Sequence, residues 1–388
     1  MSITAKAIKL HDQFFGNEWK ERLEDRWVYE DFRKDLRWRK GWISFDCALY
    51  EPSQDRVYLG ITSFDGDIFR AYDRRQKSFI DLGYGRIADP FDAKFHRSLE
   101  RGPDGCLYGA IALLHCVDHQ FDAPGGAIVK FDPATGSLSK IAIPIPHTYI
   151  QSIVIDHQRQ LIYCLCFPPE KICSFDLRTG KVKDFGLIGT GIGGMCQGEN
   201  LCLDDNGCCW SSWQLTRAWQ AHPGVDAQRL CKIDPTHERP IYYPKGLPRV
   251  DGNYGTTKPE GFFNLGDGML YASGGNGSIF EIDPATGDSR FLFTPITDRR
   301  SRLTSMIVGP CGNAYAITGR DGQCELLRFD FRNKSFELIG GAIKDAATGE
   351  PLWQCHHLVI TGDGTIYACE NDVPHRSGYL WEISGVWS

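Results

Sequence analysis

An all-β fold built from repeated antiparallel units is predicted by the sequence, and the first observation behind it is a recurring turn followed by an aromatic residue. The pattern occurs seven times, with separations of 50, 55, 47, 61, 44 and 52 residues between the aromatic positions. A period of this size is typical of repeat architectures. The seven aromatic residues are Tyr58, Tyr108, Tyr163, Trp210, Tyr271, Tyr315 and Tyr367.

Turn chemistry around the repeated aromatics is the second observation. Residues 103–105, 205–207 and 362–364 combine Asp or Asn with Gly, and such turns close tight antiparallel hairpins. Six repeats also carry an apolar or aromatic residue followed by Asp where a third strand would end, as in Phe131-Asp132. Four strands per repeat would form one twisted sheet, and seven such sheets would close into a seven-bladed β-propeller.

The third observation is the absence of helical patterns. No segment has the long apolar periodicity of a helical bundle, and strands do not alternate with crossover helices. We expect one propeller domain over residues 1–388, with residues 1–38 as an N-terminal extension that includes the ring-closing strand. The last repeat stops before its fourth strand, and residues 27–29 are expected to supply it. The only helix is expected within residues 12–37.

Composition and charge narrow the class of protein. Hydrophobic residues make up 42% of the chain and charged residues 24%, which is typical of a soluble globular protein. The net charge of -6 gives no basic patch for nucleic acid or anionic membranes. No apolar run is long enough to span a bilayer, and the N-terminus lacks the apolar stretch of a secretory signal. We expect a cytoplasmic monomer without membrane or nucleic-acid partners, or a secreted one if a signal has been removed.

The chain has 15 cysteines, an odd number that fits reduced thiols acting as small buried apolar residues. The spacing of Cys164 with Cys166 and of Cys208 with Cys209 is not that of a zinc finger. A structural zinc site is therefore not expected. We expect no cofactor, with a divalent cation as the alternative.

In a propeller, the loop that enters the innermost strand and the loop after the second strand emerge on the same face, where ligand sites gather. Entry loops here contain Asp46, Lys94, Arg97, Glu260 and Arg302 besides the candidate residues chosen below. The candidates at entry and exit positions are His96, His115, Tyr149, Lys171, Arg217, Arg320, His356 and His357, with Trp213 beside them.

His96 and His115 lie at the same end of one predicted hairpin, so their imidazoles are expected to share a site. Imidazole takes and gives protons near neutral pH, and Tyr149 is a proton donor of high pKa. Cations such as Lys171 and Arg217 would neutralise a carboxylate and so acidify the adjacent C5 proton of a uronic acid. Together these side chains suit β-elimination. The alternative is that each histidine only forms a hydrogen bond at the rim of the propeller and that Tyr149 packs in the core.

The remaining candidates have roles in binding. Arg320 and the His356-His357 pair would anchor the substrate from the same face. The alternative is that Arg320 is an ordinary surface arginine and that the two histidines only form hydrogen bonds at the rim. Trp213 is expected to stack on a sugar ring.

The pair His96 and His115, followed by Tyr149 and Lys171 in the next blade, resembles seven-bladed polysaccharide lyases that act on uronate-containing glycans, of the ulvan lyase and rhamnose–glucuronate lyase type. The family usually has arginine at the position of Lys171, and Tyr163 with Arg178 is another match at similar spacing. The resemblance implies a lyase that cleaves a glycosidic bond to glucuronate in an oligosaccharide, with release of rhamnose from rhamnosyl-glucuronate as one outcome.

Two other classes stay open. Glu199, Glu260 and His356 occupy one column of the alignment and would suit a divalent cation in a lactonase-like or metal-assisted propeller. A non-enzymatic interaction scaffold is the third class, although the blades lack the Gly-His and Trp-Asp signatures of the commonest scaffold repeat. Fold alone does not decide among these classes.

Overall fold

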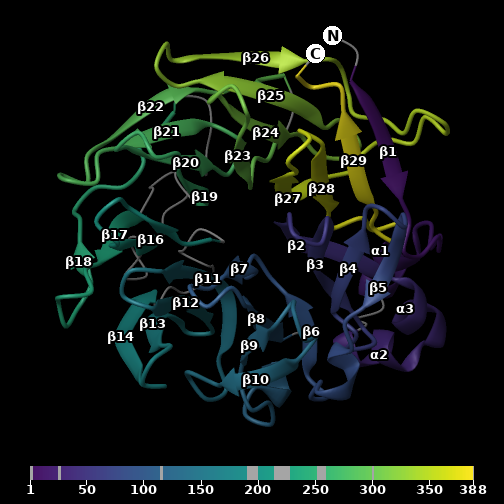
Figure 1. The fold of residues 1–388 in the computed structure, drawn as a ribbon, viewed down its shortest axis with the longest axis horizontal. Helices are drawn as coiled ribbons and strands as arrows, with labels where there is room; N and C mark the ends of the chain where they lie inside the picture. The colour runs from purple at the N-terminus through teal and green to yellow at the C-terminus, as the bar shows by residue number, and fades with distance from the viewer. Residues whose placement is uncertain are drawn as a thin grey trace.

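The computed structural model describes residues 3–24, 28–113, 117–189, 200–213, 228–250, 259–298 and 301–387. Antiparallel sheets follow one another around a central axis (Figure 1). In the described ranges the strands form five four-stranded sheets and one nine-stranded sheet. The predicted all-β propeller with a short helical N-terminal extension is confirmed.

The nine-stranded sheet holds the first two repeats. Its strands are β2 (Ile43–Glu51), β3 (Arg56–Ser63), β4 (Phe69–Asp73), β5 (Ser78–Asp81), β6 (Asp92–Phe95), β7 (Glu100–Arg101), β8 (Leu107–Leu113), β9 (Ile128–Phe131) and β10 (Leu138–Ala142). Strands β2 to β5 form one four-strand unit and β7 to β10 another, and β6 joins them by pairing with both β3 and β8. Because two units share a sheet, the count of seven blades stays a prediction.

The other sheets each contain four strands. They are β11 (Tyr149–Asp156), β12 (Leu161–Phe167), β13 (Glu170–Asp176) and β14 (Val182–Gly189); β15 (Cys202–Leu203), β16 (Cys209–Trp213), β17 (Arg229–Ile233) and β18 (Ile241–Tyr242); β19 (Pro259–Asn264), β20 (Leu270–Gly274), β21 (Ile279–Ile282) and β22 (Ser289–Phe293); β23 (Met306–Val308), β24 (Ala314–Thr318), β25 (Glu325–Asp330) and β26 (Ser335–Ile339); and β27 (Cys355–Ile360), β28 (Ile366–Glu370), β29 (Leu380–Ser384) and β1 (Thr4–Ile8).

The ring is closed by β1, and the expectation that residues 27–29 supply this strand is wrong. Strand β1 pairs antiparallel with β29, from Thr4 opposite Ser384 to Ile8 opposite Leu380. Ala5 packs with buried residues of the last two sheets, and Ile8, on the other face of the strand, packs with those of the nine-stranded sheet. Tyr29 instead begins a helix, and the two ends of the described chain lie close together (Figure 1).

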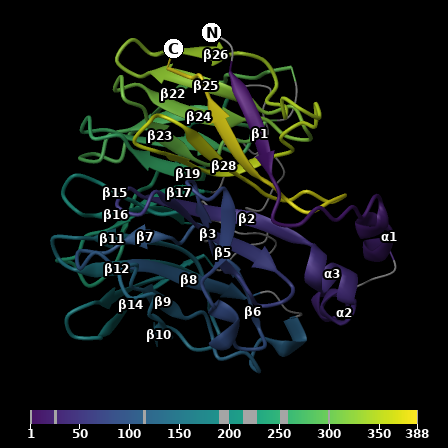
Figure 2. The same ribbon diagram turned by 45° about the vertical axis from the view of Figure 1, so that its right-hand side comes forward.

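The N-terminal extension contains three short helices rather than one. They are α1 (Glu18–Glu24), α2 (Tyr29–Lys34) and α3 (Leu36–Gly41), and two 3-10 turns follow later, η1 (Tyr84–Arg86) and η2 (Val117–His119). Asp35 separates α2 from α3 because its side chain accepts hydrogen bonds from the backbone of Arg37 and Trp38. Figure 2 shows the helices projecting to one side of the ring. None of the described helices is long and apolar enough to cross a membrane.

The repeated aromatics are buried between neighbouring sheets, and their polar ends explain the sequence pattern. The Tyr108 hydroxyl donates to Asp104 Oδ2 at 2.9 Å, and the Tyr271 hydroxyl donates to Asp267 Oδ2 at 2.7 Å. Tyr108 and Tyr271 therefore each bond to the turn residue four positions before them, while their rings enter the core. The 13 cysteines in the described ranges form no disulfide, and all but Cys106 and Cys311 are buried, as predicted for small apolar residues.

Candidate functional site

A cluster of charged and imidazole side chains lies where the innermost strands of several sheets meet. We call it the axial cluster. It consists of Asp46, Lys94, His96, Arg97, Glu260, Arg302, His356 and His357, which come from strands β2, β6, β19 and β27, the loop after β6 and the loop before β23.

His96 pairs with His356, a residue distant in sequence. Their ring centroids are 5.0 Å apart, and the rings are inclined by 51°. His96 Nδ1 donates to the Gln151 carbonyl at 2.8 Å, and His356 Nδ1 donates to the Asp46 carbonyl at 2.7 Å. In a neutral imidazole the proton on Nδ1 leaves Nε2 as the basic nitrogen, so both rings are in the same tautomer.

Arg97 contacts this pair from the residue next to His96. Its Nε donates to His356 Nε2 at 3.2 Å, and its Nη1 donates to the Glu260 carbonyl at 2.7 Å. The backbone of Arg97 has a φ of 40°, in the left-handed region that a residue with a side chain rarely adopts. Strained backbone of this kind persists where the surroundings hold it and is concentrated at functional sites.

Asp46 is the buried acid of the cluster. Burial raises the pKa of Asp46 to about 6, although the nearby Lys94 ammonium and the hydrogen bond from Thr62 act to lower it. Lys94 Nζ lies 3.5 Å from Asp46 Oδ1, and Asn371 also donates to this carboxyl group. Asp46 therefore fixes the positions of Lys94 and, through its backbone carbonyl, of His356.

The carboxylate of Glu260 is paired with the guanidinium of Arg302. Arg302 Nε donates to Glu260 Oε2 at 3.1 Å, and Arg302 Nη1 lies 3.5 Å from Asp372 Oδ2. Within the part of the chain that the structure describes, no group of three or more His, Cys, Asp or Glu side chains is placed to hold a metal ion. Glu199, the other carboxylate of the metal hypothesis, lies outside the described residues.

A cavity of 230 Å³ lies along the axis beside the cluster. Its titratable lining residues are Arg97, Glu100 and His357. Burial raises the pKa of Glu100 to about 7. Burial also lowers the pKa of His357 to about 3, assisted by the neighbouring His356 and Arg97. His357 is therefore neutral at physiological pH, while Glu100 is close to half protonated.

Glu100→Gln is expected to stabilise the protein at pH 8 by about 3 kcal/mol and to leave stability unchanged at pH 4. The ordinary pKa of the carboxyl group is 4.5, and its folded value is about 7. The unfolded state thus loses this proton first, and the wild-type protein loses stability as pH rises between these two values. Urea denaturation at both pH values measures the difference, and an equal effect at pH 4 and pH 8 would contradict it.

The structure brings together only part of the predicted site. His96, His356 and His357 belong to the axial cluster, and the half-buried Tyr149 begins β11 two residues before the Gln151 carbonyl that His96 binds. His115 and Arg217 lie outside the described residues. The predicted pairing of His96 with His115 is therefore untested.

Three other predicted residues are not in the axial cluster. Lys171 forms an ion pair with Asp184 on the outermost strand β14, at 2.5 Å. The Trp213 indole donates to the Tyr243 carbonyl at 3.3 Å and contacts Tyr242 edge-on, so its ring packs within its own sheet. Arg320 is half-buried in the loop after β24.

The sequence placed Arg97, Asp46, Lys94 and Arg302 in entry loops but gave no reason to choose them. The signal for Arg97 was its position next to His96 at the entry to an innermost strand. Glu100 carried no signal, because its altered pKa arises from burial in the assembled ring.

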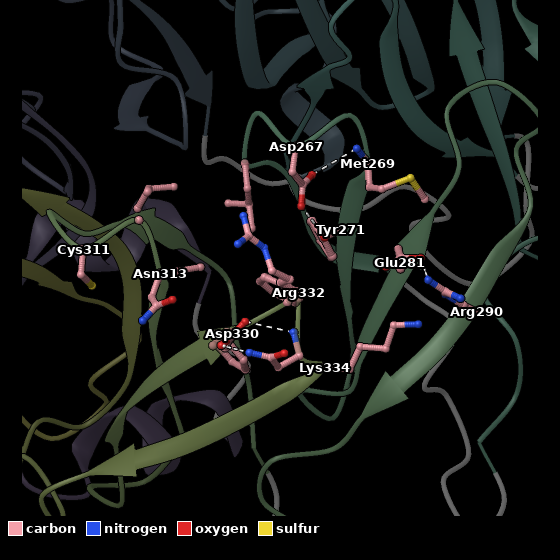
Figure 3. A pocket seen from close by; sticks show the side chains of 17 residues that line it. Asp267, Met269, Tyr271, Glu281, Arg290, Cys311, Asn313, Asp330, Arg332 and Lys334 are labelled. Atoms are coloured by element: carbon pink, nitrogen blue, oxygen red, sulfur yellow. Dashed lines mark hydrogen bonds and ion pairs between the residues drawn. The ribbon is translucent and has the colours of Figure 1, made fainter.

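A larger groove of 720 Å³ lies between the sheet β19–β22 and the sheet β23–β26. Figure 3 shows Arg332 extending into the groove, with Asp267 and Tyr271 on one wall and Asn313 and Cys311 on the other. Its charged residues balance, since the three basic residues Arg290, Arg332 and Lys334 are matched in number by Asp267, Glu281 and Asp330. The lining also includes the apolar side chains of Leu265, Val308, Phe329 and Phe331.

Comparisons with known proteins identify the fold. No family model and no curated protein match the sequence. The structure is similar to an extracellular domain assigned to a hybrid two-component system of B. thetaiotaomicron, with a TM-score of 0.58 and 11% identity over 87% of this chain. The match spans 38% of that domain.

Two further solved structures have similar folds. A chain of the Mitotic Checkpoint Complex matches with a TM-score of 0.53 and 12% identity, over 88% of this chain and 89% of that chain. The WD40 repeats of RRP9 match with a TM-score of 0.57 and 9% identity, over 88% and 94%. At this identity the likeness concerns the fold alone, and the chain is a β-propeller.

Proposed function

We propose that the axial cluster is the active site of a lyase that cleaves a glycosidic bond to a uronic acid by β-elimination. The observation that supports this proposal is the pair of buried imidazoles, His96 and His356, with the Arg97 guanidinium against one of them. A base, a fixed cation and a low-dielectric surrounding are what removal of a proton next to a carboxylate requires.

We assign the role of base to His96. Its Nδ1 proton is held by the Gln151 carbonyl, so the basic Nε2 is oriented by a fixed hydrogen bond. The Nε2 of His356 instead accepts a hydrogen bond from Arg97, and His356 thereby positions that cation. In this proposal Arg97, rather than the predicted Lys171, neutralises the substrate carboxylate, while the predicted role of Arg217 lies outside the described residues.

The proposed step balances without a cofactor. His96 Nε2 takes the proton from C5 of the uronate, and the electron pair of that C–H bond forms the C4–C5 double bond. The bond from C4 to the glycosidic oxygen breaks, and its electron pair leaves with the oxygen. The Tyr149 hydroxyl, at the start of β11, gives its proton to this oxygen.

Charge balance in the cluster favours a substrate with one carboxylate. Three cations, Lys94, Arg97 and Arg302, are interleaved with the acids Asp46 and Glu260. A long polyanion would favour a continuous basic groove, and the net charge of -6 does not supply one. We therefore propose a short glucuronate-bearing saccharide as substrate, with rhamnosyl-glucuronate as the first to test.

The purified chain is expected to generate an unsaturated uronate from such a saccharide, detected by its ultraviolet absorbance. The panel should contain rhamnosyl-glucuronate and other glucuronate and galacturonate disaccharides. Matched glucosides without the carboxylate serve as controls and should give no signal, because the C5 proton is not acidified. No absorbance change with any uronate would refute the proposed elimination.

A second candidate function is a platform for protein binding. The groove between the sheets β19–β22 and β23–β26 favours it, since 720 Å³ lined by both apolar and charged side chains is large enough for a peptide segment. Propellers also occur in assemblies such as the Mitotic Checkpoint Complex. Inactivity on the saccharide panel would favour this candidate.

A further inference from the structure

The axial cavity presents hydroxyl groups that still have a proton to donate. Ser152 Oγ accepts a hydrogen bond from the Leu201 backbone N–H at 3.3 Å, and Ser305 Oγ accepts one from the Leu358 backbone N–H at 3.0 Å. Both serines line the cavity. A hydroxyl that accepts a hydrogen bond can donate its own proton at the same time, so each serine can also donate to a group inside the cavity.

His357 adds a third donor. Its Nδ1 accepts a hydrogen bond from the Ala48 backbone N–H at 3.3 Å, so the proton of the neutral ring is on Nε2. The low pKa of His357 keeps the ring neutral and this tautomer in place. The ring lines the cavity next to the permanent positive charge of Arg97.

Glu100 is the acidic side chain among the residues that line the cavity. Burial raises its pKa to about 7, so at slightly acidic pH the carboxyl group is protonated and becomes a fourth donor. The other titratable groups that face it are Arg97, His357 and the thiols of Cys47 and Cys202. Burial raises the pKa of Cys47 to about 12 and that of Cys202 further, so neither thiol changes charge near neutral pH.

We propose that the axial cavity binds a small oxyanion, either a carboxylate or an inorganic anion of the sulfate class. Donors from Ser152, Ser305, His357 and protonated Glu100 would surround the oxygens, and Arg97 would supply the positive charge. The arrangement resembles general oxyanion recognition, in which fixed donors and one cation replace the hydration shell. This site shares Arg97 and His357 with the axial cluster, but anion binding in the cavity does not require the proposed elimination.

Calorimetric titration of the full chain with sulfate tests the proposal, because sulfate does not change its charge between pH 6 and pH 8. A group of pKa about 7 is protonated in about nine molecules of ten at pH 6 and about one of ten at pH 8. Sulfate affinity is therefore expected to fall about tenfold over this range. Glu100→Gln, which keeps a donor and cannot ionise, should bind equally at both pH values.

Glu337→Gln is the matched control, since Glu337 lies on the exposed strand β26 and pairs with Arg328. This variant should keep the wild-type pH dependence. Absence of sulfate binding at pH 6, or the same pH dependence in Glu100→Gln as in the wild type, would overturn the proposal.

Two sources of the oxyanion are distinguished by competition. If free glucuronate displaces sulfate, the cavity takes a saccharide carboxylate; if it does not, the cavity is an inorganic anion site. His96→Asn should retain sulfate binding. If this variant loses lyase activity and still binds sulfate, the proposed active site is tested separately from the anion cavity. A crystal soaked in selenate should show its anomalous signal beside Glu100, and a signal only elsewhere would count against the cavity.

Discussion

Arg376→Met is expected to lower the free energy of unfolding by about 3 to 5 kcal/mol, because it leaves a fully buried carboxylate without its cation. Arg376 Nη1 and Nη2 donate to the two oxygens of Glu370 at 2.7 and 3.0 Å, and the Glu370 side chain has 0% exposure. Glu370 also accepts the backbone N–H groups of Trp353 and Tyr379. Arg376 thus ties together the loops of the last sheet.

Arg328→Met is the matched control for this substitution. Arg328 pairs with Glu337 on the outer strands, where the two side chains are 39% and 58% exposed. Solvent screens such a pair, so the loss should be below about 1 kcal/mol. Urea denaturation of both variants measures the difference. Adding Glu370→Gln to Arg376→Met should recover part of the lost free energy of unfolding. Equal losses for Arg376→Met and Arg328→Met would contradict the prediction.

His96→Asn is expected to lower kcat for uronate elimination by at least about 100-fold, the usual contribution of a positioned base. Asparagine reproduces the Nδ1 donor that bonds to the Gln151 carbonyl and removes the basic Nε2. The fold should therefore persist while the proton acceptor is lost. Initial rates on the most active saccharide of the panel give kcat and KM for both proteins.

The control for this experiment is His237→Asn. His237 lies in the turn after β17, where it is 58% exposed and 3.2 Å from Asp234. This substitution should leave kcat unchanged. A rate for His96→Asn within about twofold of the wild-type rate would remove His96 from the proposed chemistry, since a base contributes far more than that.

The repeat could be predicted because its signal is local. At Tyr108 and Tyr271 the aromatic bonds to the turn residue four positions before it, so neighbouring residues encode both the hairpin and the buried ring. Ring closure is not local. Residues 27–29 have high strand propensity, but Tyr29 packs against Phe64 and begins a helix, while β1 reaches β29 across the whole chain.

The site was predictable only in part for the same reason. His96 was found from its place at a strand entry, whereas its contact with His356 requires the first and last sheets to meet. Arg97 and His356 bond although 259 positions separate them in the chain. The identity of each residue was visible in the sequence, but its partner was fixed by closure of the ring.

The pairing of β1 with β29 also determines how the molecule responds to mechanical force. Thr4 lies opposite Ser384, so both chain ends leave the pair on the same side. Tension between the ends therefore peels these strands apart one hydrogen bond at a time instead of shearing them together. The last sheet is where such a pull first opens the ring.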